Sequence, residues 1–287
     1  MPLIHPDTSI IYRPMTDEDL AGAHRLSQAV RWPHRLEDWQ FVHRLGIGFV
    51  AEQDGAVVGT GMGWKQGKRF GSLGMMIVSP EHQGQGIGRQ LMMRVLGQLG
   101  ERCTLLSATP AGQPLYESLG FRPTGTTIHQ HQGTMLRVPA VALARSDAIR
   151  PITGEDIPTL IELENRATGF RRDELLKHMA SAAHGVVLEC DGEIRGFSAI
   201  RDFGRGRLIG PVIAPDSERA AALIAYWSAA YADSFVRVDV TVDGHLGDSL
   251  DAMGLMKINS VVAMARNGLP PRDQRIAQFA IANQALC

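Results

Sequence analysis

Residues 77–92 have the sequence IVSPEHQGQGIGRQLM, and their order predicts a strand, a glycine-rich turn and a helix. The strand is the apolar run Met75–Val78, which stops at a Ser-Pro pair. Helical spacing follows, because apolar residues recur at Ile87, Leu91, Val95, Leu96 and Leu99. Glycines at positions 84, 86 and 88 let an anion approach the free backbone N–H groups at the positive end of the helix dipole. The stretch therefore predicts a turn that binds a phosphate or a diphosphate.

Two familiar phosphate-binding motifs do not match this turn. The Walker motif requires Lys-Ser or Lys-Thr after its last glycine, whereas Arg89 and Gln90 follow here. The dinucleotide motif G-x-G-x-x-G would need a glycine at position 89 and a strand–helix–strand unit near the start of a sheet. The remaining pattern is Q-x-x-G-x-G, which spans Gln83–Gly88 and resembles the coenzyme A pyrophosphate loop of the GNAT superfamily of acyl-CoA-dependent N-acyltransferases. A glycine-rich turn without a ligand is the alternative.

The composition is that of an ordinary globular protein. The chain has 287 residues, enough for about two domains, and is 44% hydrophobic and 21% charged. Its formal net charge is -1, and its Lys and Arg residues are spread along the chain. These features argue against a nucleic-acid partner or an anionic membrane surface.

Cysteine usage and hydropathy favour a cytoplasmic location. The three cysteines, Cys103, Cys190 and Cys287, form no C-x-x-C pair, which favours neither a disulfide framework nor a metal site. Met1–Thr8 lacks the basic and apolar pattern of a signal peptide, and no window approaches about 18 consecutive apolar residues. We therefore expect a cytoplasmic protein with no metal and no membrane partner.

The chain contains an internal repeat with a nearly constant offset. Arg13–Leu20 matches Arg150–Ile157, and Val50–Gly55 matches Val187–Gly192, both at an offset of 137 residues. Two further landmarks follow at offsets of 135 and 134 residues, namely Pro80 with Pro215 and Leu119–Phe121 with Met253–Leu255. The repeat predicts two copies of one domain.

The two copies differ at the glycine-rich turn. Glu218–Leu223 lies in line with Gln83–Gly88 and contains no glycine, and neither does the longer stretch Asp216–Tyr231. A carboxylate at Glu218 would also repel a diphosphate. The second copy is therefore expected to keep the fold and to lack the cofactor site.

The resemblance to GNAT proteins covers both copies, and it is specific in the first copy and limited to the fold in the second. It implies an α/β fold with two tandem GNAT-like domains of the bacterial type, each a mixed, mostly antiparallel sheet flanked by helices. We expect a catalytic domain at residues 1–138 and a degenerate domain at residues 147–266. Residues 267–287 are expected to form a linker and an amphipathic helix.

The resemblance also implies how acetyl-CoA is held as a co-substrate. Backbone N–H groups of Gly84–Arg89 would bind the pyrophosphate, and the end of the preceding strand would pair with the pantetheine arm because it splays from its neighbour. Thr109 stands where many family members place an asparagine that bonds the pantetheine. The expected cofactor-binding residues are Met76, Ile77, Val78, Gln83, Gly84, Gln85, Gly86, Ile87, Gly88, Arg89 and Thr109.

The catalytic acid is expected to be Tyr116. The stretch Gln113–Phe121 resembles the family's helix in which a tyrosine precedes x-x-L-G-F, close to the cofactor sulfur. A phenol with a pKa of about 10 protonates a thiolate with a pKa of about 8.5 only if proton transfer accompanies C–S cleavage or the site lowers its pKa. The alternative is a tyrosine that only packs on the sheet. The aligned residue in the second copy is Leu250.

The general base stays open. Some family members place a glutamate on the strand before the loop, but the corresponding residue here is Ser72, which cannot act as a base. The remaining candidates are Glu52, Asp54, His34, Asp38 and a chain of water molecules. Asp54 also suits a turn, and Glu52 suits the surface.

The acceptor is expected to bind at the segment between the first two helices, Arg31–Trp39, as in other family members. Aromatic faces and a carboxylate suit an ammonium group, so the expected substrate-binding residues are Trp32, His34 and Asp38. The alternative is that Trp32 anchors a loop and Trp39 packs in the core. Two acids of the second copy, Asp239 and Asp243, are candidates for an inter-domain cleft or for a turn.

Together these features favour an N-acetyltransferase that moves an acetyl group from acetyl-CoA to a primary amine of a small molecule by direct attack in a ternary complex. The degenerate domain would narrow the acceptor site. A non-catalytic acyl-CoA-binding regulatory protein is the main alternative, and a duplicated nucleotide-binding protein is a third. We expect a monomer or a homodimer.

Overall fold

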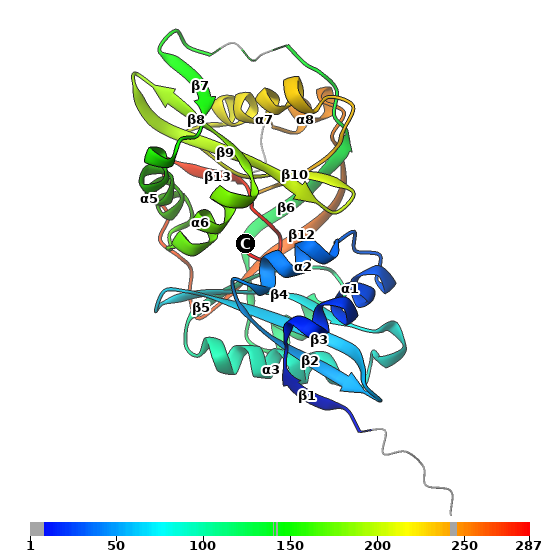
Figure 1. Cartoon of the computed structure of the whole chain (residues 1–287). Helices are drawn as coiled ribbons and strands as arrows, with labels where there is room; N and C mark the ends of the chain where they lie inside the picture. The colour runs from blue at the N-terminus through cyan, green and yellow to red at the C-terminus, as the bar shows by residue number, and fades with distance from the viewer. Residues whose placement is uncertain (1–8, 140, 142, 242–245) are drawn as a thin grey trace, which may run out of the picture.

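The computed structural model describes residues 9–139, 141, 143–241 and 246–287 (Figure 1). Both copies of the repeat follow the same order of elements, and their aligned elements have similar lengths. The first half consists of β1 Ile11–Pro14, α1 Leu20–Ala29, α2 Leu36–His43, β2 Ile47–Gln53, β3 Ala56–Gln66, β4 Phe70–Val78, α3 Ile87–Leu99, β5 Cys103–Ala108, α4 Gln113–Ser118 and β6 Arg122–Thr134.

The second half begins at the strand that corresponds to β1 and ends with one additional strand, β13. Its elements are β7 Asp147–Pro151, α5 Ile157–Thr168, α6 Asp173–Ala182, β8 His184–Cys190, β9 Glu193–Phe203, β10 Gly206–Ala214, α7 Ser217–Tyr231, β11 Phe235–Val240, α8 Leu246–Ala252, β12 Met256–Arg266 and β13 Ala277–Ala280. The predicted fold class, an α/β protein with two tandem domains of mostly antiparallel strands, is confirmed.

One ion-pair pattern explains why the repeat is visible in the sequence. Arg13 lies 2.7 Å from Asp19 and 2.6 Å from Glu52, so it ties β1 to the start of α1 and to β2. Arg150 makes the same pair of contacts in the second half, with Asp156 and Glu189, both at 2.8 Å. Arg13, Arg150 and their acidic partners are therefore matched in the two halves because they stabilise the same local fold.

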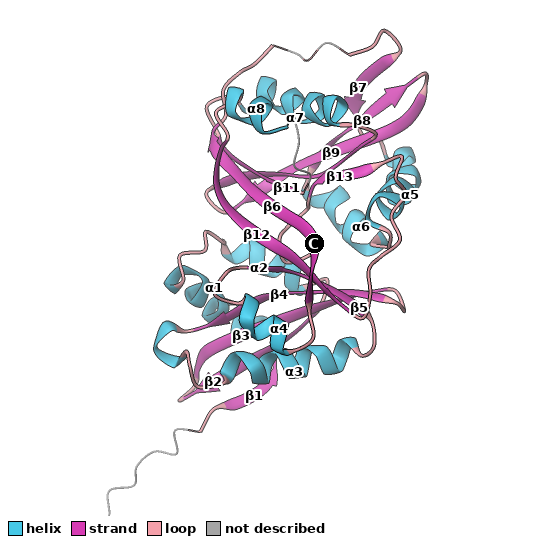
Figure 2. Ribbon diagram, turned by 180° about the vertical axis from the view of Figure 1, so that it is seen from behind, coloured by secondary structure: helices cyan, strands magenta, loops and turns pink. Residues whose placement is uncertain are grey.

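The strands of the described residues form one continuous sheet, because β6 of the first half and β12 of the second half are exchanged. The order is β1-β2-β3-β4-β5-β12-β6-β11-β13-β10-β9-β8-β7. Strand β12 of the second half pairs with β5, for example Ala265 with Leu105, while β6 of the first half pairs with β11. Figure 2 shows β6 and β12 crossing between the two halves. The sheet is thus shared across the boundary that the repeat predicts at residue 138.

Helices cover both faces of the sheet in the first half, and β4 alternates between them. Leu73 and Met76 pack against α3. Met75 and Ile77 pack on the opposite face, in the core with α1 and α2. One face of β4 therefore packs against α3, and the other face packs against α1 and α2.

The predicted C-terminal helix is wrong. Within the described residues 267–287 there is no helix, and Ala277–Ala280 forms β13, which pairs with both β10 and β11. A short apolar run is compatible with helix or strand, and here the unpaired edges of two neighbouring strands decide the outcome. No helix within the described part of the chain combines the length and the apolarity that crossing a membrane requires.

Candidate functional site

The glycine-rich turn lies between β4 and α3 and leaves the start of α3 open. Gly84 and Gly86 have φ angles of 78° and 80°, in the left-handed region that favours glycine. Gly86 caps α3, and no side chain caps the helix. The first helical bond runs from Gln90 N–H to Gly86 O at 3.1 Å, so three N–H groups precede it without a helical acceptor. This arrangement suits an anion.

The side chains of the turn anchor it in place. The Gln83 side chain donates to Val78 O at 3.2 Å, and Arg89 donates to Ser118 Oγ on α4 at 3.1 Å. Ile87 is buried in the core, so only its backbone faces the turn. A Cβ placed on Gly86 meets no atom within 4 Å, which shows that φ, and not crowding, requires glycine there.

The strand before the turn diverges from β5, as the resemblance implied. Parallel pairing is limited to Phe70–Ser72 of β4, opposite residues 103–105, and none follows it. The register with β3 also shifts, because Thr60 opposes Ile77 while Met62 opposes Gly74. Among the described residues, the backbone groups on the β5 side of residues 74–78 therefore have no strand partner.

Met75 lies at the centre of this bulge and was missed by the sequence reasoning. Its φ is 52°, a left-handed value that costs a non-glycine residue roughly 1–3 kcal/mol. The hydroxyl of Thr60 donates to Met75 O at 2.8 Å and holds the bulge in place. No sequence signal marks a methionine for this conformation. Strain of this kind concentrates at functional sites.

In the second half, the start of the helix is capped and the gap between the diverging strands is filled. Asp216 caps α7, and its carboxylate accepts from Arg219 N–H at 2.9 Å. Glu218, which aligns with the glycine-rich turn in the sequence, lies in the first turn of α7. Strand β10 likewise leaves β11 after Ile209, but β13 fills the position between them, with Val212 opposite Ala280. Two obstacles thus lie at these positions of the second half, where the loss of the cofactor site stays a prediction.

Tyr116 lies on α4, beside the start of α3. It is 8% exposed and packs edge-on against Phe121, with ring centroids 6.2 Å apart. Burial raises the pKa of Tyr116 to about 12, so the phenol is protonated at neutral pH. Among the described residues its hydroxyl has no hydrogen-bond partner. A proton donor is therefore available, although it is a weaker acid than a free phenol.

Thr109 lies in the turn that leads into α4. Its hydroxyl oxygen accepts from Gly112 N–H at 3.3 Å, and its backbone oxygen accepts from the N–H groups of Gly112 and Gln113. The hydroxyl oxygen thus supports the turn, while its hydrogen remains a possible donor. Binding of pantetheine by Thr109 stays a prediction.

The acceptor segment packs against the second half. The His34 ring lies 5.7 Å from Trp32, 6.4 Å from Trp39 and 5.3 Å from Phe203 of β9. Its Nδ1 is enclosed and has no hydrogen-bond partner in the described structure. Burial lowers the pKa of His34 to about 4, so the ring is neutral. The structure brings Trp32 and His34 together at the junction of the two halves, and Trp39 belongs to the core.

Asp38 is buried and engaged in structural bonds. Its carboxylate accepts from the backbone N–H of Arg35 and from that of Gly204, both at 2.9 Å. The Arg35 guanidinium adds a contact at 3.1 Å. Asp38 therefore caps α2 and links it to the second half, and a role in substrate binding stays a prediction.

The other acids occupy structural positions as well. Glu52 belongs to the ion pair with Arg13, and Asp54 lies in the β2–β3 turn with φ 50°. Asp239 is not a turn residue, because it lies within β11, buried and paired with Arg237 at 2.8 Å. Asp243 lies outside the described residues. The identity of the general base therefore stays open.

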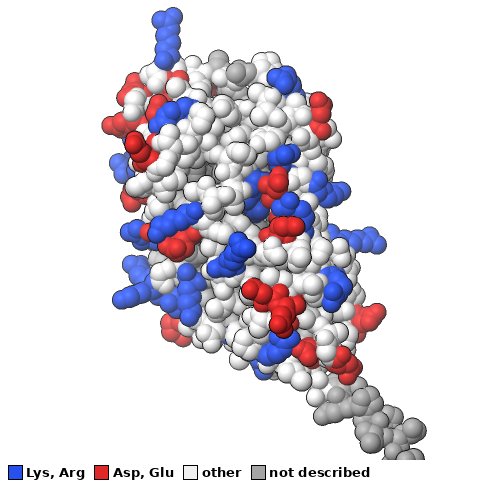
Figure 3. Space-filling view, in the orientation of Figure 1, with Lys and Arg blue, Asp and Glu red and all other residues white. Residues whose placement is uncertain are grey.

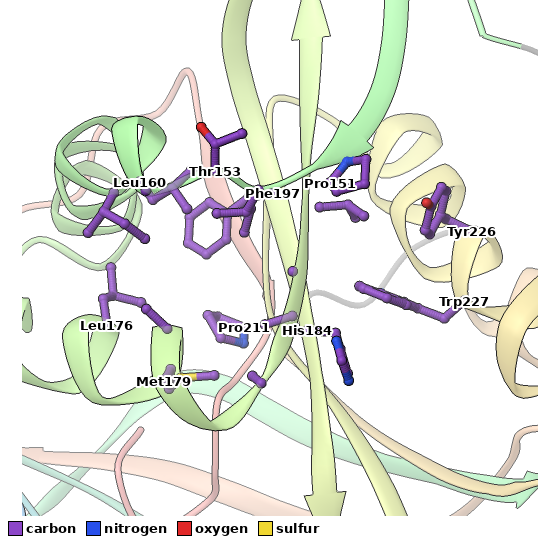
Figure 4. Close-up of a pocket in the computed structure, with 18 of the residues that line it drawn as sticks. Pro151, Thr153, Leu160, Leu176, Met179, His184, Phe197, Pro211, Tyr226 and Trp227 are labelled. Carbon is purple, nitrogen blue, oxygen red and sulfur yellow. The ribbon is translucent and has the colours of Figure 1, made fainter.

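The second half contains an apolar cavity of about 500 Å³ (Figure 4). Leu176 and Met179 of α6 lie on one side of it, and Tyr226 and Trp227 of α7 lie on the other. Leu176 of the second half aligns with Trp39 of the first half, and the larger Trp39 side chain is fully buried in the core of the first half. None of the residues that line the cavity is a predicted site residue, so it is a separate feature of the second half.

Charge is distributed without a dominant sign on the face shown in Figure 3, where acidic and basic side chains alternate. Among the described residues, no group of three or more His, Cys, Asp or Glu side chains is placed to hold a metal ion.

Comparisons with known proteins agree with this geometry. Two family models, each described as an acetyltransferase (GNAT) domain, match residues 44–123 and 160–280. The chain is 26% identical over 250 residues to the uncharacterized N-acetyltransferase YitH of Bacillus subtilis, with 84% of this chain and 86% of that protein covered. It is 24% identical over 282 residues to the holothin acyltransferase of a Pseudoalteromonas species, with 88% and 93% covered.

Solved structures share the fold. A putative acetyltransferase from Pyrococcus horikoshii superposes with a TM-score of 0.79 at 18% identity, covering 100% of this chain and 99% of the other. A tandem GNAT protein from the clavulanic acid biosynthesis pathway superposes with a TM-score of 0.64 at 14% identity, covering 90% and 98%.

Proposed function

The chain belongs to the GNAT acetyltransferase family and carries the family's domain twice, and from this premise we propose that its first half transfers an acetyl group from acetyl-CoA to a primary amine of a small molecule. The observation that carries the proposal is the asymmetry between the halves. The first half keeps an uncapped glycine-rich turn and an unfilled divergence of two strands, whereas Asp216 and β13 occupy the equivalent places in the second.

Acetyl-CoA fits the first of these features through its diphosphate. The N–H groups of Ile87, Gly88 and Arg89 point out of the start of α3, where the helix dipole favours negative charge. The pantetheine arm fits the second, because the β5 side of residues 74–78 offers backbone donors and acceptors without a strand partner. A backbone N–H of β4 would also polarise the thioester carbonyl.

Chemistry then requires one proton donor and one proton acceptor. The amine nitrogen attacks the thioester carbonyl carbon, the C–N bond forms and the C–S bond breaks. Tyr116 donates its phenolic proton to the departing thiolate, which leaves as the free thiol. The excess proton on the amine passes to a base or to water. Burial raises the pKa of Tyr116 to about 12, so the phenol is protonated before the reaction and its proton must move as the C–S bond breaks.

The second half restricts the acceptor. Phe203 covers His34, and Gly204 donates to Asp38, so the loop that would receive the amine is closed on one side by β9 and the turn after it. This enclosure favours a small amine over the flexible tail of a protein. One relative is named holothin acyltransferase, and this name gives holothin as the acceptor of that protein. A cytoplasmic location and a monomeric or homodimeric state stay predictions, as does the absence of nucleic-acid and membrane partners.

Two measurements test the proposal. We expect the protein to bind acetyl-CoA by calorimetry and to release free thiol from it when primary amines are supplied. Tight binding without thiol release on a broad panel of amines would favour a regulatory acyl-CoA-binding protein. Binding of ATP or NAD in place of acetyl-CoA would contradict both.

A further inference from the structure

Residues 281–287, here called the C-terminal segment, leave β13 and run from the second half into the first. The C-terminus lies between the two halves (Figure 1). Ile281 N–H donates to the backbone oxygen of Asp239 at 3.0 Å, which holds the beginning of the segment on the second half. Arg201 donates to Ala282 O at 3.4 Å. The segment thus continues the strand that fills the divergence in the second half.

The end of the segment lies directly on β4 of the first half. A Cβ placed on Gly74 would lie 2.7 Å from Ala285 Cα and 3.0 Å from Ala285 O, so the two backbones approach at a distance that only glycine permits. Leu286 is 1% exposed and belongs to the same apolar cluster as Met75 and Ile77. The contact is therefore with the strained bulge itself.

The segment covers the face of β4 that is opposite to α3. The glycine-rich turn begins α3, and α3 packs on the face that carries Leu73 and Met76. A donor bound at the start of α3 enters the divergence from that side. An amine must then approach the thioester from the opposite face, where Ala285 and Leu286 lie.

Several bonds hold the segment in place. Arg172, itself paired with the buried Glu164, donates to the backbone oxygens of Leu286 and Cys287. Gln284 donates to Asp239 at 3.2 Å. Asn283 is 3% exposed, and its Nδ2 is enclosed without a hydrogen-bond partner among the described residues. An enclosed donor without an acceptor calls for a specific explanation, and an oxygen of a bound ligand supplies one.

We propose that Asn283–Cys287 forms a wall of the acceptor site in the first half and sets the size of the amine that the site accepts. This proposal rests on the acetyltransferase function proposed above. Strand β13, which precedes the C-terminal segment, fills the strand divergence of the second half. The C-terminal segment itself would lie next to the thioester in the first half. The second half would thus contribute to catalysis through the C-terminal segment.

The test compares substrate size preferences in three proteins. The probes are primary alkylamines from ethylamine to octylamine, with kcat/KM measured for each and acetyl-CoA affinity measured by calorimetry. Leu286→Ala removes apolar volume from the wall and should shift the ratio of kcat/KM for octylamine to that for ethylamine about tenfold toward octylamine. Acetyl-CoA affinity should stay within about twofold of the parent, because only the opposite face changes.

A matched control separates the wall from general destabilisation. Leu163 is similarly buried, at 5% exposed, but it packs within the core of the second half alone. Leu163→Ala should lower the melting temperature and leave the amine ratio unchanged. If Leu286→Ala does not fold, the milder Gln284→Ala, which removes the bond to Asp239, should shift the ratio in the same direction.

The outcomes distinguish the two proposals. A parent protein that acetylates the amines, with a ratio that neither variant of the segment changes, would overturn the wall and leave the acetyltransferase function intact. A shift of equal size in Leu163→Ala would also overturn the wall. A parent protein that binds acetyl-CoA and acetylates no amine would overturn the proposed function, and the wall with it.

Discussion

The carboxylate of Asp38 in the first half accepts a hydrogen bond from the backbone N–H of Gly204 in the second half, at 2.9 Å. Gly204 has a φ of 55°, and a Cβ placed there would lie 2.9 Å from Pro33 O. The turn after β9 therefore packs backbone-to-backbone against the acceptor loop. Because this partly buried bond joins the two halves, the second half helps to fix the conformation of the loop that precedes α2.

Gly86→Ala should weaken acetyl-CoA binding. The left-handed φ of 80° costs an L-residue roughly 1–2 kcal/mol, and the relaxed turn would misalign the N–H groups of α3. We expect the Kd for acetyl-CoA to rise at least about tenfold, since 1.4 kcal/mol corresponds to that factor. Gly67, with φ 63° and no atom within 4 Å of a placed Cβ, is the matched control. Equal Kd values for Gly67→Ala and Gly86→Ala would contradict the anion-binding role.

Tyr116→Phe should lower kcat by about 10²–10⁴-fold, the usual range for a general acid, while the Kd for acetyl-CoA changes little. Steady-state kinetics and calorimetry measure the two quantities. The variant keeps the ring that packs against Phe121, so its fold should be retained. A variant with the parent's kcat would assign Tyr116 to packing alone.

Tyr116 also predicts a loss of stability at high pH. Burial raises its pKa from 10 to about 12, so the folded state disfavours the phenolate. The unfolded chain releases this proton more easily, and the stabilising effect, complete below pH 10, is lost as the pH rises toward 12. Denaturant titrations at several pH values should show a steeper decline above pH 10 for the parent than for Tyr116→Phe. Parallel declines would contradict the burial of the hydroxyl.

His34 predicts a loss of stability at low pH. Its pKa is lowered from 6.5 to about 4, chiefly by burial, so the unfolded state binds the proton more readily. Stability should therefore fall as the pH drops from 6.5 to 4, by up to about 3 kcal/mol for this group. His34→Gln should flatten this part of the profile. His184→Gln, at an exposed histidine, should not, and a similar effect from both would refute the assignment to His34.

Acetyl-CoA should bind once per chain. The second half caps α7 with Asp216 and fills its strand divergence with β13, so removing the cap alone leaves the second obstacle. Calorimetry should give one site for the parent and one for Asp216→Ala. A second site in either protein would contradict the structural basis for the loss. Gly84 and Gly86 of the first half would then no longer account for the specificity of binding.

Much of the site was accessible from local sequence. The strand, turn and helix around Gly86 and the helix that carries Tyr116 are formed by short-range signals, namely apolar spacing, glycine at positive φ and a helix terminus. The repeat was equally accessible, because Arg13 and Arg150 preserve the same ion pairs. The structure places these elements as expected.

Other features depend on pairing between distant segments. The left-handed φ of Met75 follows from a register shift against β3, and no property of methionine announces it. The stretch Ala277–Ala280 is apolar and short, so its own preference is weak. It becomes a strand only because β10 and β11 separate and leave hydrogen-bonding groups on both sides.

By itself, then, the sequence determined the family, the duplication and the half that carries the glycine-rich turn, because each depends on residues close together in the chain. Only the tertiary structure decided that β6 and β12 are exchanged, that His34 is enclosed by Phe203 and that Ala285 lies on Gly74. The physical reason is that these contacts join segments far apart in sequence. Their existence depends on the register and twist of the whole sheet, which local spacing does not encode.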